Sequence, residues 1–280
     1  MPATPLKRAL PAPVRRLGRT AYETLRGGLA DTVEWLKGER RPLTPPRRLW
    51  HLIGSGRMDF HGSGAELREF LIQQGLRPDH RVLDVGCGLG RLAIALTPYL
   101  SDKGGFDGFD IMPRVIRWCR KITAAYPNYR FQLVDVQSDR YHRAGETRAA
   151  SFRFPYEDAR FDFVVLTSVF THLMPADMEN YLAETARVLK PGGKALLGFY
   201  LLSDAKRAEI AGGGGALAFP HGGDGYWAEL AEEPEAAIAY DEARILKLIA
   251  ADGMEVAAAY PGEWAVKPIH SQDVLIVRKR

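Results

Sequence analysis

The sequence has little cysteine: among its 280 residues only Cys87 and Cys119 occur. Two cysteines cannot make a disulfide framework, and they form no cluster with metal-ligand spacing, a pattern typical of a protein from a reducing cytoplasm without a bound metal. No apolar run reaches the roughly 18 residues that a membrane-spanning helix needs, and no hydrophobic segment of a secretory signal is visible. These absences predict a cytoplasmic protein that does not cross a membrane.

No internal repeat is visible either, and hydrophobic residues make up 46% of the chain. A chain of this length and content can bury one substantial core. We therefore expect a main domain over residues 51–280, in which a glycine-rich insertion at residues 203–240 forms a lid. Residues 1–50 are expected to form a separate basic arm.

The arm carries most of the positive charge. Residues 1–60 contain twelve Lys or Arg and five Asp or Glu, although the whole chain has a net charge of only +4. Behind several prolines, apolar residues recur at the spacing of an amphipathic helix: Val14, Leu17, Ala21, Leu25, Leu29, Val33 and Leu36. Two alternatives stay open for this helix: packing on the main domain or on a second subunit of a homodimer, and contact with an anionic membrane. Nucleic acid is not expected as a partner, because no platform of aromatic and basic residues accompanies the helix.

Strand patterns and helical patterns alternate along the main domain. Strands are expected at residues 81–85, 105–109, 130–134, 161–167 and 194–201, and helices at residues 66–74, 90–97, 113–125 and 176–189. The sequence KPGG at residues 190–193 is expected to end the last of these helices as a turn. A further helix at residues 241–251 and strands at residues 254–260 and 272–277 close the chain. This order predicts an α/β fold: a doubly wound, mainly parallel sheet of seven strands with helices on both faces.

The stretch VLDVGCGLG places three glycines, Gly86, Gly88 and Gly90, directly behind a buried strand. Glycine permits positive φ and a close approach of the backbone to a ligand, with Cys87 as a small filler between two of them. The spacing G-x-G-x-G differs from the G-x-G-x-x-G of dinucleotide sites, and no Walker lysine follows. Asp84, just before the loop, would repel a pyrophosphate but suits a ligand with an ammonium group.

Ligands of such sheets bind beyond the carboxyl ends of the strands, where further polar residues occur. Asp110 follows the second strand and can accept hydrogen bonds from both hydroxyls of a ribose, next to Ile111. Asp135 and Val136 follow the third strand and offer a carboxylate for an amino group beside an apolar surface for a base. Thr167 ends the fourth strand. These strand ends predict a site for an adenosine that carries a cationic group in place of phosphate.

With these motifs in order, the chain from about residue 60 to its end resembles the class I S-adenosylmethionine-dependent methyltransferases, of Rossmann-like fold. The resemblance rests on VLDVGCGLG, GFDGFDIMP, FQLVDV, FPYEDARFDFVVLTSVFTHL and ENYLAETARVLKPGGKALL. It implies S-adenosylmethionine as the cofactor and S-adenosylhomocysteine as the product. It further implies that Asp84 and the glycine loop face the methionine part, Asp110 the ribose and Asp135 the adenine.

His172 is the candidate general base, because it follows the fourth strand and an imidazole near its usual pKa can accept a proton from a hydroxyl. The alternative is that His172 only organises the start of the next helix. No acidic pair with ligand spacing accompanies it, which disfavours a metal-dependent transfer.

The acceptor pocket is expected where the loop at residues 137–153 and the insertion at residues 203–240 rise over the sheet. Aromatic side chains there and near the C-terminus suit a sugar ring or an aromatic metabolite: Tyr141, Tyr226, Trp227, Tyr260 and Trp264. We therefore expect O-methylation of a small molecule or a glycan. An N- or C-methyltransferase, and a cofactor-binding module without catalysis, stay open as alternatives.

Overall fold

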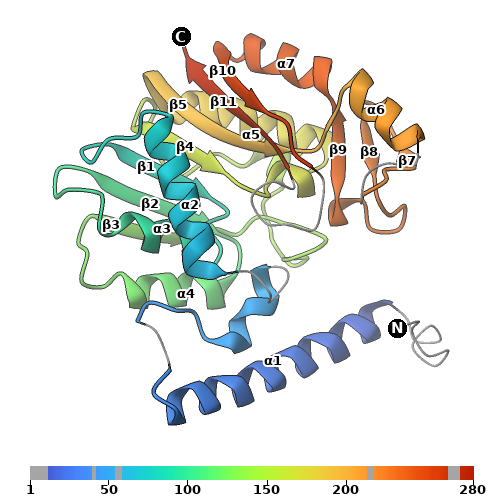
Figure 1. Cartoon of the computed structure of the whole chain (residues 1–280). Coiled ribbons are helices and arrows are strands. Elements are labelled where there is room, and N and C mark those ends of the chain that lie inside the picture. The colour runs from blue at the N-terminus through green and yellow to red at the C-terminus, as the bar shows by residue number, and fades with distance from the viewer. Residues whose placement is uncertain (1–11, 40–41, 54–58, 213–216, 264–271) are drawn as a thin grey trace.

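The computed structural model describes residues 12–39, 42–53, 59–212, 217–263 and 272–280, with side chains from Thr20 onward. Its centre is a seven-stranded sheet in the order β10-β11-β5-β4-β1-β2-β3 (Figure 1). The strands are β1 (Arg81–Val85), β2 (Gly105–Asp110), β3 (Tyr129–Leu133), β4 (Phe161–Leu166), β5 (Leu189–Phe199), β10 (Met254–Tyr260) and β11 (Asp273–Lys279). The first five pair in parallel, and β11 runs antiparallel to β5 and β10. The expected α/β fold with a mainly parallel, seven-stranded sheet is confirmed.

Helices cover both faces of this sheet, because successive residues of its strands point to opposite sides. Val82 of β1 packs in a cluster with α2 (Phe60–Gln73), α3 (Arg91–Leu96) and α4 (Pro113–Ile122). The next residue, Leu83, packs on the other side with α5 (Pro175–Val188) and α7 (Glu242–Ala251). The continuous apolar sequence of β1 follows from burial on both faces.

The structure of the segment KPGG differs from the one expected. It does not end a helix as a turn but lies within β5, which begins at Leu189 directly after α5. The pairing of β4 with β5 passes from Phe161↔Leu189 to Phe163↔Lys194, so the extra residues of β5 bulge out of the ladder. Gly192, with φ of 75°, allows the bulge.

The described part of residues 201–241 forms a second, smaller sheet within the expected insertion. Its order is β6-β9-β8-β7, with β6 (Leu201–Leu202), β7 (His221–Gly222), β8 (Tyr226–Ala228) and β9 (Ile238–Asp241), and α6 (Asp204–Ala211) follows β6. The sequence predicts none of these strands, because two to four residues are too few to show a strand period. A short helical turn, η5 (Pro234–Ala236), precedes β9.

The arm consists of a long helix, α1 (Ala12–Leu36), and a 3-10 helix, η2 (Arg47–Ile53). The η2 residues Leu49 and Trp50 are buried against Phe60, Leu89 and Val115, and the Trp50 indole donates to the Pro45 carbonyl at 2.9 Å. The expected boundary after residue 50 therefore falls inside an element that packs on the main domain. In the described residues, no helix is both long and apolar enough to cross a membrane.

Candidate active site

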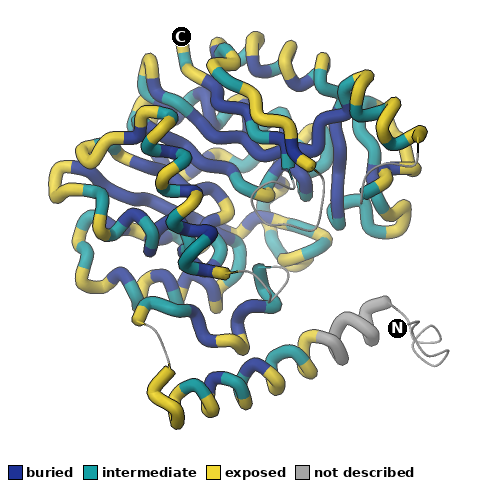
Figure 2. Tube along the Cα trace, viewed as in Figure 1, coloured by how far each residue is buried: buried dark blue, intermediate teal, exposed yellow. Residues whose placement is uncertain are grey.

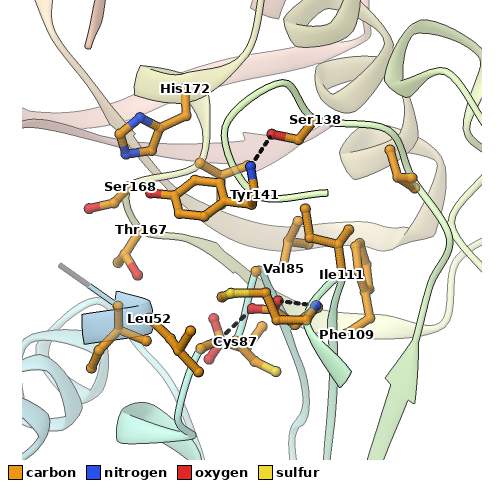
Figure 3. Close-up of a pocket in the computed structure, with 18 of the residues that line it drawn as sticks. Leu52, Val85, Cys87, Phe109, Ile111, Ser138, Tyr141, Thr167, Ser168 and His172 are labelled. Atoms are coloured by element: carbon orange, nitrogen blue, oxygen red, sulfur yellow. Dashed lines mark hydrogen bonds between the residues drawn. The ribbon is translucent and has the colours of Figure 1, made fainter. Parts of the chain in front are cut away.

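A cavity of about 450 Å³ opens at the carboxyl ends of β1, β2 and β4. It is large enough for a small-molecule ligand. Ten residues expected at the site line it: Asp84, Gly86, Cys87, Gly88, Asp110, Ile111, Val136, Tyr141, Thr167 and His172. Figure 3 shows Thr167, Ser168, Tyr141 and His172 on one side of the cavity, across from Val85, Cys87 and Ile111. The parallel sheet thus gathers strand ends that are far apart in the sequence.

The glycine loop has the backbone conformation expected from its sequence. Gly86, Gly88 and Gly90 have φ of 67°, 51° and 75°, the left-handed region that side chains strain. A Cβ on Gly86 would lie 3.0 Å from Val169 and one on Gly88 would lie 3.2 Å from Ile53. The loop backbone therefore borders the cavity closely. Gly90 is not part of the lining but precedes α3 as its N-cap.

Asp110 ties the glycine loop to the end of β2. One carboxylate oxygen accepts from the Gly88 N–H at 3.0 Å and the other from the Met112 N–H at 2.9 Å. Burial raises the pKa of Asp110 to about 6, against these hydrogen bonds, which lower it. A carboxylate has about four acceptor positions, and the backbone groups of Gly88, Ile111 and Met112 leave acceptor capacity for a hydroxyl of a ligand.

Asp84 is buried on β1 with 4% of its surface exposed. Burial raises the pKa of its carboxyl to about 7, while nearby Arg91 favours the charged form and Asp110 opposes it. A buried acid with such a pKa is poised to ionise when a cation arrives beside it. Asp84 lines the cavity together with Arg91. The cavity wall is therefore suited to a ligand with a positive group.

His172 lies on the short helical turn η4 (Phe170–His172) after β4. Its Nδ1 donates to the Glu235 carbonyl at 2.8 Å, and because a carbonyl can only accept, the proton of the neutral ring resides on Nδ1. Burial lowers the pKa of His172 to about 4. The expectation of a pKa near the usual value is therefore wrong: the imidazole stays neutral at physiological pH, with the lone pair on Nε2.

Glu235, from η5 of the insertion, also fixes the loop that covers the cavity. Its carboxylate accepts from Ser138 Oγ at 2.9 Å and from the Arg140 N–H at 3.1 Å. The Ser138 oxygen in turn accepts from the Tyr141 N–H at 3.2 Å (Figure 3). Tyr141 meets the His172 ring edge to face, with 5.9 Å between ring centroids. One glutamate thus orients both the imidazole and the aromatic side chain next to it.

Several residues expected at the site lie elsewhere. The Asp135 carboxylate, half exposed, binds His142 Nε2 at 2.7 Å and is not part of the cavity lining, so this placement does not support contact with an adenine. Tyr226 packs on the main core and Trp227 lies under Arg207, both outside the lining. Tyr260, on the edge strand β10, meets Phe70 edge to face, with 5.0 Å between ring centroids. Trp264 lies outside the described residues.

The sequence analysis did not identify several other residues that line the cavity. Leu52 and Ile53 line the cavity from η2, the 3-10 helix of the arm, and Arg140 lines it from the 137–153 loop. Ser168 lines the cavity with φ of 57°, and its hydroxyl accepts from Gln272 at 3.0 Å. No sequence signal marks such a residue, because strain in a serine backbone is imposed by its surroundings.

In the described part of the chain, no three His, Cys, Asp or Glu side chains gather as a metal site.

Comparison with known proteins points to one family. A family model described as a methyltransferase domain matches residues 82–193. The 27-O-demethylrifamycin SV methyltransferase of Amycolatopsis mediterranei is 34% identical over 173 residues, which are 58% of this chain and 57% of that protein. The demethylmenaquinone methyltransferase of Symbiobacterium thermophilum is 31% identical over 127 residues, 45% of either chain. The chain thus spans about half the length of these curated relatives.

The fold is shared with solved structures. The structure of magnesium protoporphyrin IX methyltransferase from Synechocystis superposes with a TM-score of 0.52 and 18% identity, over 82% of this chain and 92% of that one. At this identity the likeness concerns the fold alone.

Proposed function

Because the chain contains a class I S-adenosylmethionine-dependent methyltransferase domain, we propose that it transfers the methyl group of this cofactor to a hydroxyl of a small molecule or glycan. The observation that carries the proposal is the cavity, which joins two buried carboxylates, a glycine loop and a neutral imidazole at one edge of the sheet. Both curated relatives described above are named for small-molecule acceptors, one of them for an oxygen position.

The residues of the cavity fit S-adenosylmethionine. When bound, the cofactor supplies an activated methyl group on a sulfonium. Asp84 would pair with its ammonium group, and the loop at Gly86 and Gly88 leaves room where any Cβ would crowd Val169 and Ile53. Asp110 would accept from the ribose hydroxyls. Ile111 and Val136 offer apolar surface for the adenine, whereas Asp135 lies outside the cavity lining.

His172 would accept the proton of the attacking hydroxyl. The Glu235 carbonyl holds the Nδ1 proton, so Nε2 is the acceptor, and the same carbonyl stabilises the imidazolium that forms. Tyr141 and the apolar cavity wall position the acceptor and exclude water. Positioning alone is worth about 7 to 11 kcal/mol in favourable cases, so the base adds to an effect that the cavity already supplies.

Binding calorimetry tests the cofactor assignment. S-adenosylmethionine and S-adenosylhomocysteine should bind in the micromolar range, while NAD should not bind. Asp110→Ala should weaken cofactor binding by about 1 to 3 kcal/mol, because it removes a charged acceptor for two hydroxyls. Binding of NAD, or an unchanged affinity in the variant, would contradict the assignment.

Turnover separates an enzyme from a silent binding module. Incubation with S-adenosylmethionine and a panel of hydroxylated small molecules and sugars should produce S-adenosylhomocysteine together with an O-methylated product. Tight cofactor binding without any product across amine, carbon-acid and hydroxyl acceptors would instead identify a cofactor-binding module.

Glu235→Ala tests whether the carboxylate of Glu235 positions the loop at residues 137–153. The variant loses the carboxylate that accepts from Ser138 and Arg140 but keeps the carbonyl that holds His172. We expect kcat/KM for the acceptor to fall about tenfold, since charged hydrogen bonds are worth about 1.5 to 3 kcal/mol and part of the loop is exposed. Cofactor affinity should change less than about twofold.

Two further variants serve as controls for Glu235→Ala. Glu235→Gln keeps one acceptor oxygen and should regain part of the activity. Glu233→Ala removes the partly exposed ion pair with Arg140 and should cost less than about threefold. Equal losses for Glu233→Ala and Glu235→Ala would mean that Glu235 does not position the loop.

A further inference from the structure

Helix α1 turns its apolar side away from the protein. Five residues at helical spacing form this apolar face of α1, and between 48% and 71% of each is exposed: Tyr22, Leu25, Leu29, Val33 and Leu36. Figure 2 shows exposed segments recurring along the described part of the helix. Amphipathic helices of single domains ordinarily bury such a face against the core. Contiguous exposed apolar surface marks an interaction site.

The opposite face of α1 is the one that packs, and two contacts fix its rotation. Gly27 lies against η2 so closely that a Cβ there would come within 2.5 Å of the Arg48 backbone nitrogen. Asp31, with 9% of its surface exposed, accepts from the Arg47 N–H at 2.6 Å and from Arg48 Nη1 at 2.9 Å. The helix is therefore seated by a glycine and a buried acid, and its apolar face points outward as a consequence.

The charged side chains of α1 are also divided between its two sides. The acids Asp31 and Glu34 face η2 and pair with Arg48 and Arg47, at 2.9 Å and 2.8 Å. The exposed cations Arg26 and Lys37 follow Tyr22 and Val33 by four residues, so both border the same edge of the apolar face. The outward side thus combines an apolar stripe with flanking positive charge, while the acids beneath it are already neutralised.

We propose that the apolar face of α1 docks on an anionic phospholipid bilayer, with the helix lying in the plane of the interface. A basic amphipathic helix binds such surfaces through the buried apolar area and the attraction of its cations to acidic headgroups. The apolar face runs from Tyr22 to Leu36, about 21 Å at 1.5 Å per residue, so it can contact the bilayer over about four turns of the helix. The 3-10 helix that receives α1 also contributes Leu52 and Ile53 to the cavity, which brings the site close to the membrane.

A second copy of the chain fits the apolar face of α1 less well. In an antiparallel pair of copies about a two-fold axis, the edge with Arg26 and Lys37 would lie against the same edge of the partner. Like charges would then meet along the contact, and the acids Asp31 and Glu34 lie on the far side, paired within their own chain. An anionic surface satisfies the same cations.

Vesicle co-sedimentation of the full chain tests the proposal. With vesicles of about 30% phosphatidylglycerol in phosphatidylcholine, the protein should pellet at about 50 mM salt and largely remain in solution at about 500 mM, where charges are screened within a few ångströms. Vesicles of phosphatidylcholine alone should retain little protein. Absence of binding to anionic vesicles at low salt would overturn the proposal.

Leu25→Ser/Leu29→Ser should lower the partition coefficient at least tenfold, and its thermal midpoint should match the parent, because both leucines are exposed in the protein. Leu230→Ser/Leu246→Ser, which changes two exposed leucines away from the arm, is the matched control and should bind as the parent does. Arg26→Gln/Lys37→Gln leaves the apolar face intact and should remove the preference for anionic vesicles. Equal binding of the α1 variants and the control would refute the docking surface.

Analytical ultracentrifugation without vesicles tests whether a second copy of the chain binds the apolar face of α1 instead. The full chain should sediment as a monomer at micromolar concentration. A dimer that dissociates in Leu25→Ser/Leu29→Ser would assign the apolar face of α1 to a second copy of the chain and overturn the membrane proposal.

Discussion

His172→Ala is expected to lower kcat about 10² to 10⁴-fold, towards the smaller value, while cofactor affinity changes less than about twofold. General-base assistance is typically worth this much, and a base whose pKa lies near 4 is a weak proton acceptor, which favours the lower end. The ring is held by the Glu235 carbonyl and packs on Tyr141, neither of which we assign to the cofactor, so binding should be preserved. Single-turnover measurements would separate the chemical step from product release.

His142→Ala is the matched control for His172→Ala. His142 also lies near the covering loop, but it pairs with the half-exposed Asp135 outside the cavity lining. Its removal should leave kcat within about threefold. If His172→Ala also keeps kcat within threefold while it folds normally by circular dichroism, catalysis is due to positioning alone.

The pH dependence gives an independent test of the His172 environment. Because burial lowers its pKa to about 4, the imidazole is neutral at every pH above about 5. We therefore expect no loss of kcat attributable to His172 between pH 5.5 and pH 8. An inflection near pH 6.5 that disappears in His172→Ala would show that the ring is solvated in the working enzyme and would contradict the buried arrangement.

Asp84→Asn should weaken binding of S-adenosylmethionine about 10 to 150-fold, the effect of about 1.5 to 3 kcal/mol for a hydrogen bond to a charged group. The amide keeps the shape of the side chain but cannot offer a negative charge to the ammonium group. Titration calorimetry against both variant and parent measures the difference. An affinity within twofold of the parent would mean that the ammonium group lies elsewhere.

The affinity of the parent protein should depend on pH with a definite sign. The Asp84 carboxyl has a pKa of about 7, so below pH 7 it is largely protonated and must lose its proton to pair with a cation. Between about pH 7 and pH 6 affinity should therefore fall by up to tenfold. It should level off above pH 7, and it should change less over this range in Asp84→Asn, where only Asp110, with a pKa of about 6, begins to lose its charge. Proton release on binding, seen as a dependence of the heat on the buffer, should vanish in the variant as well.

The effect of Asp84→Asn on thermal stability should be opposite in sign to its effect on cofactor affinity. A carboxyl whose pKa is higher in the folded than in the unfolded chain stabilises the fold at low pH, and this contribution is lost as the pH rises from about 4 through about 7. At pH 8 Asp84→Asn should therefore melt at a higher temperature than the parent although it binds cofactor less well. Asp107→Asn is the control: Asp107 is buried and pairs with Arg160 outside the cavity lining, so its removal should not change cofactor affinity.

The local sequence by itself determined the order of the main elements and the conformation of the glycine loop. A strand buried on both faces needs an apolar run such as the one around Leu83, and positive φ at Gly86, Gly88 and Gly90 is a property of glycine itself. The carboxyl ends of parallel strands meet at one edge whatever their distance along the chain, so the sequence also predicted that Asp84, Asp110 and His172 would gather there.

Only the tertiary structure decided how these side chains are oriented and solvated. The pKa of His172 depends on its burial, and its tautomer depends on the carbonyl of Glu235, 63 residues away in the turn η5 between two strands that are too short to be recognised. Asp135, two residues beyond the end of β3, pairs with His142 and does not line the cavity, whereas Asp110, the last residue of β2, does line it. The rotation of α1 was set by Gly27 and Asp31 against η2, not by its apolar pattern. Periodicity is a property of one segment, whereas burial and hydrogen bonding depend on which distant segments lie against it.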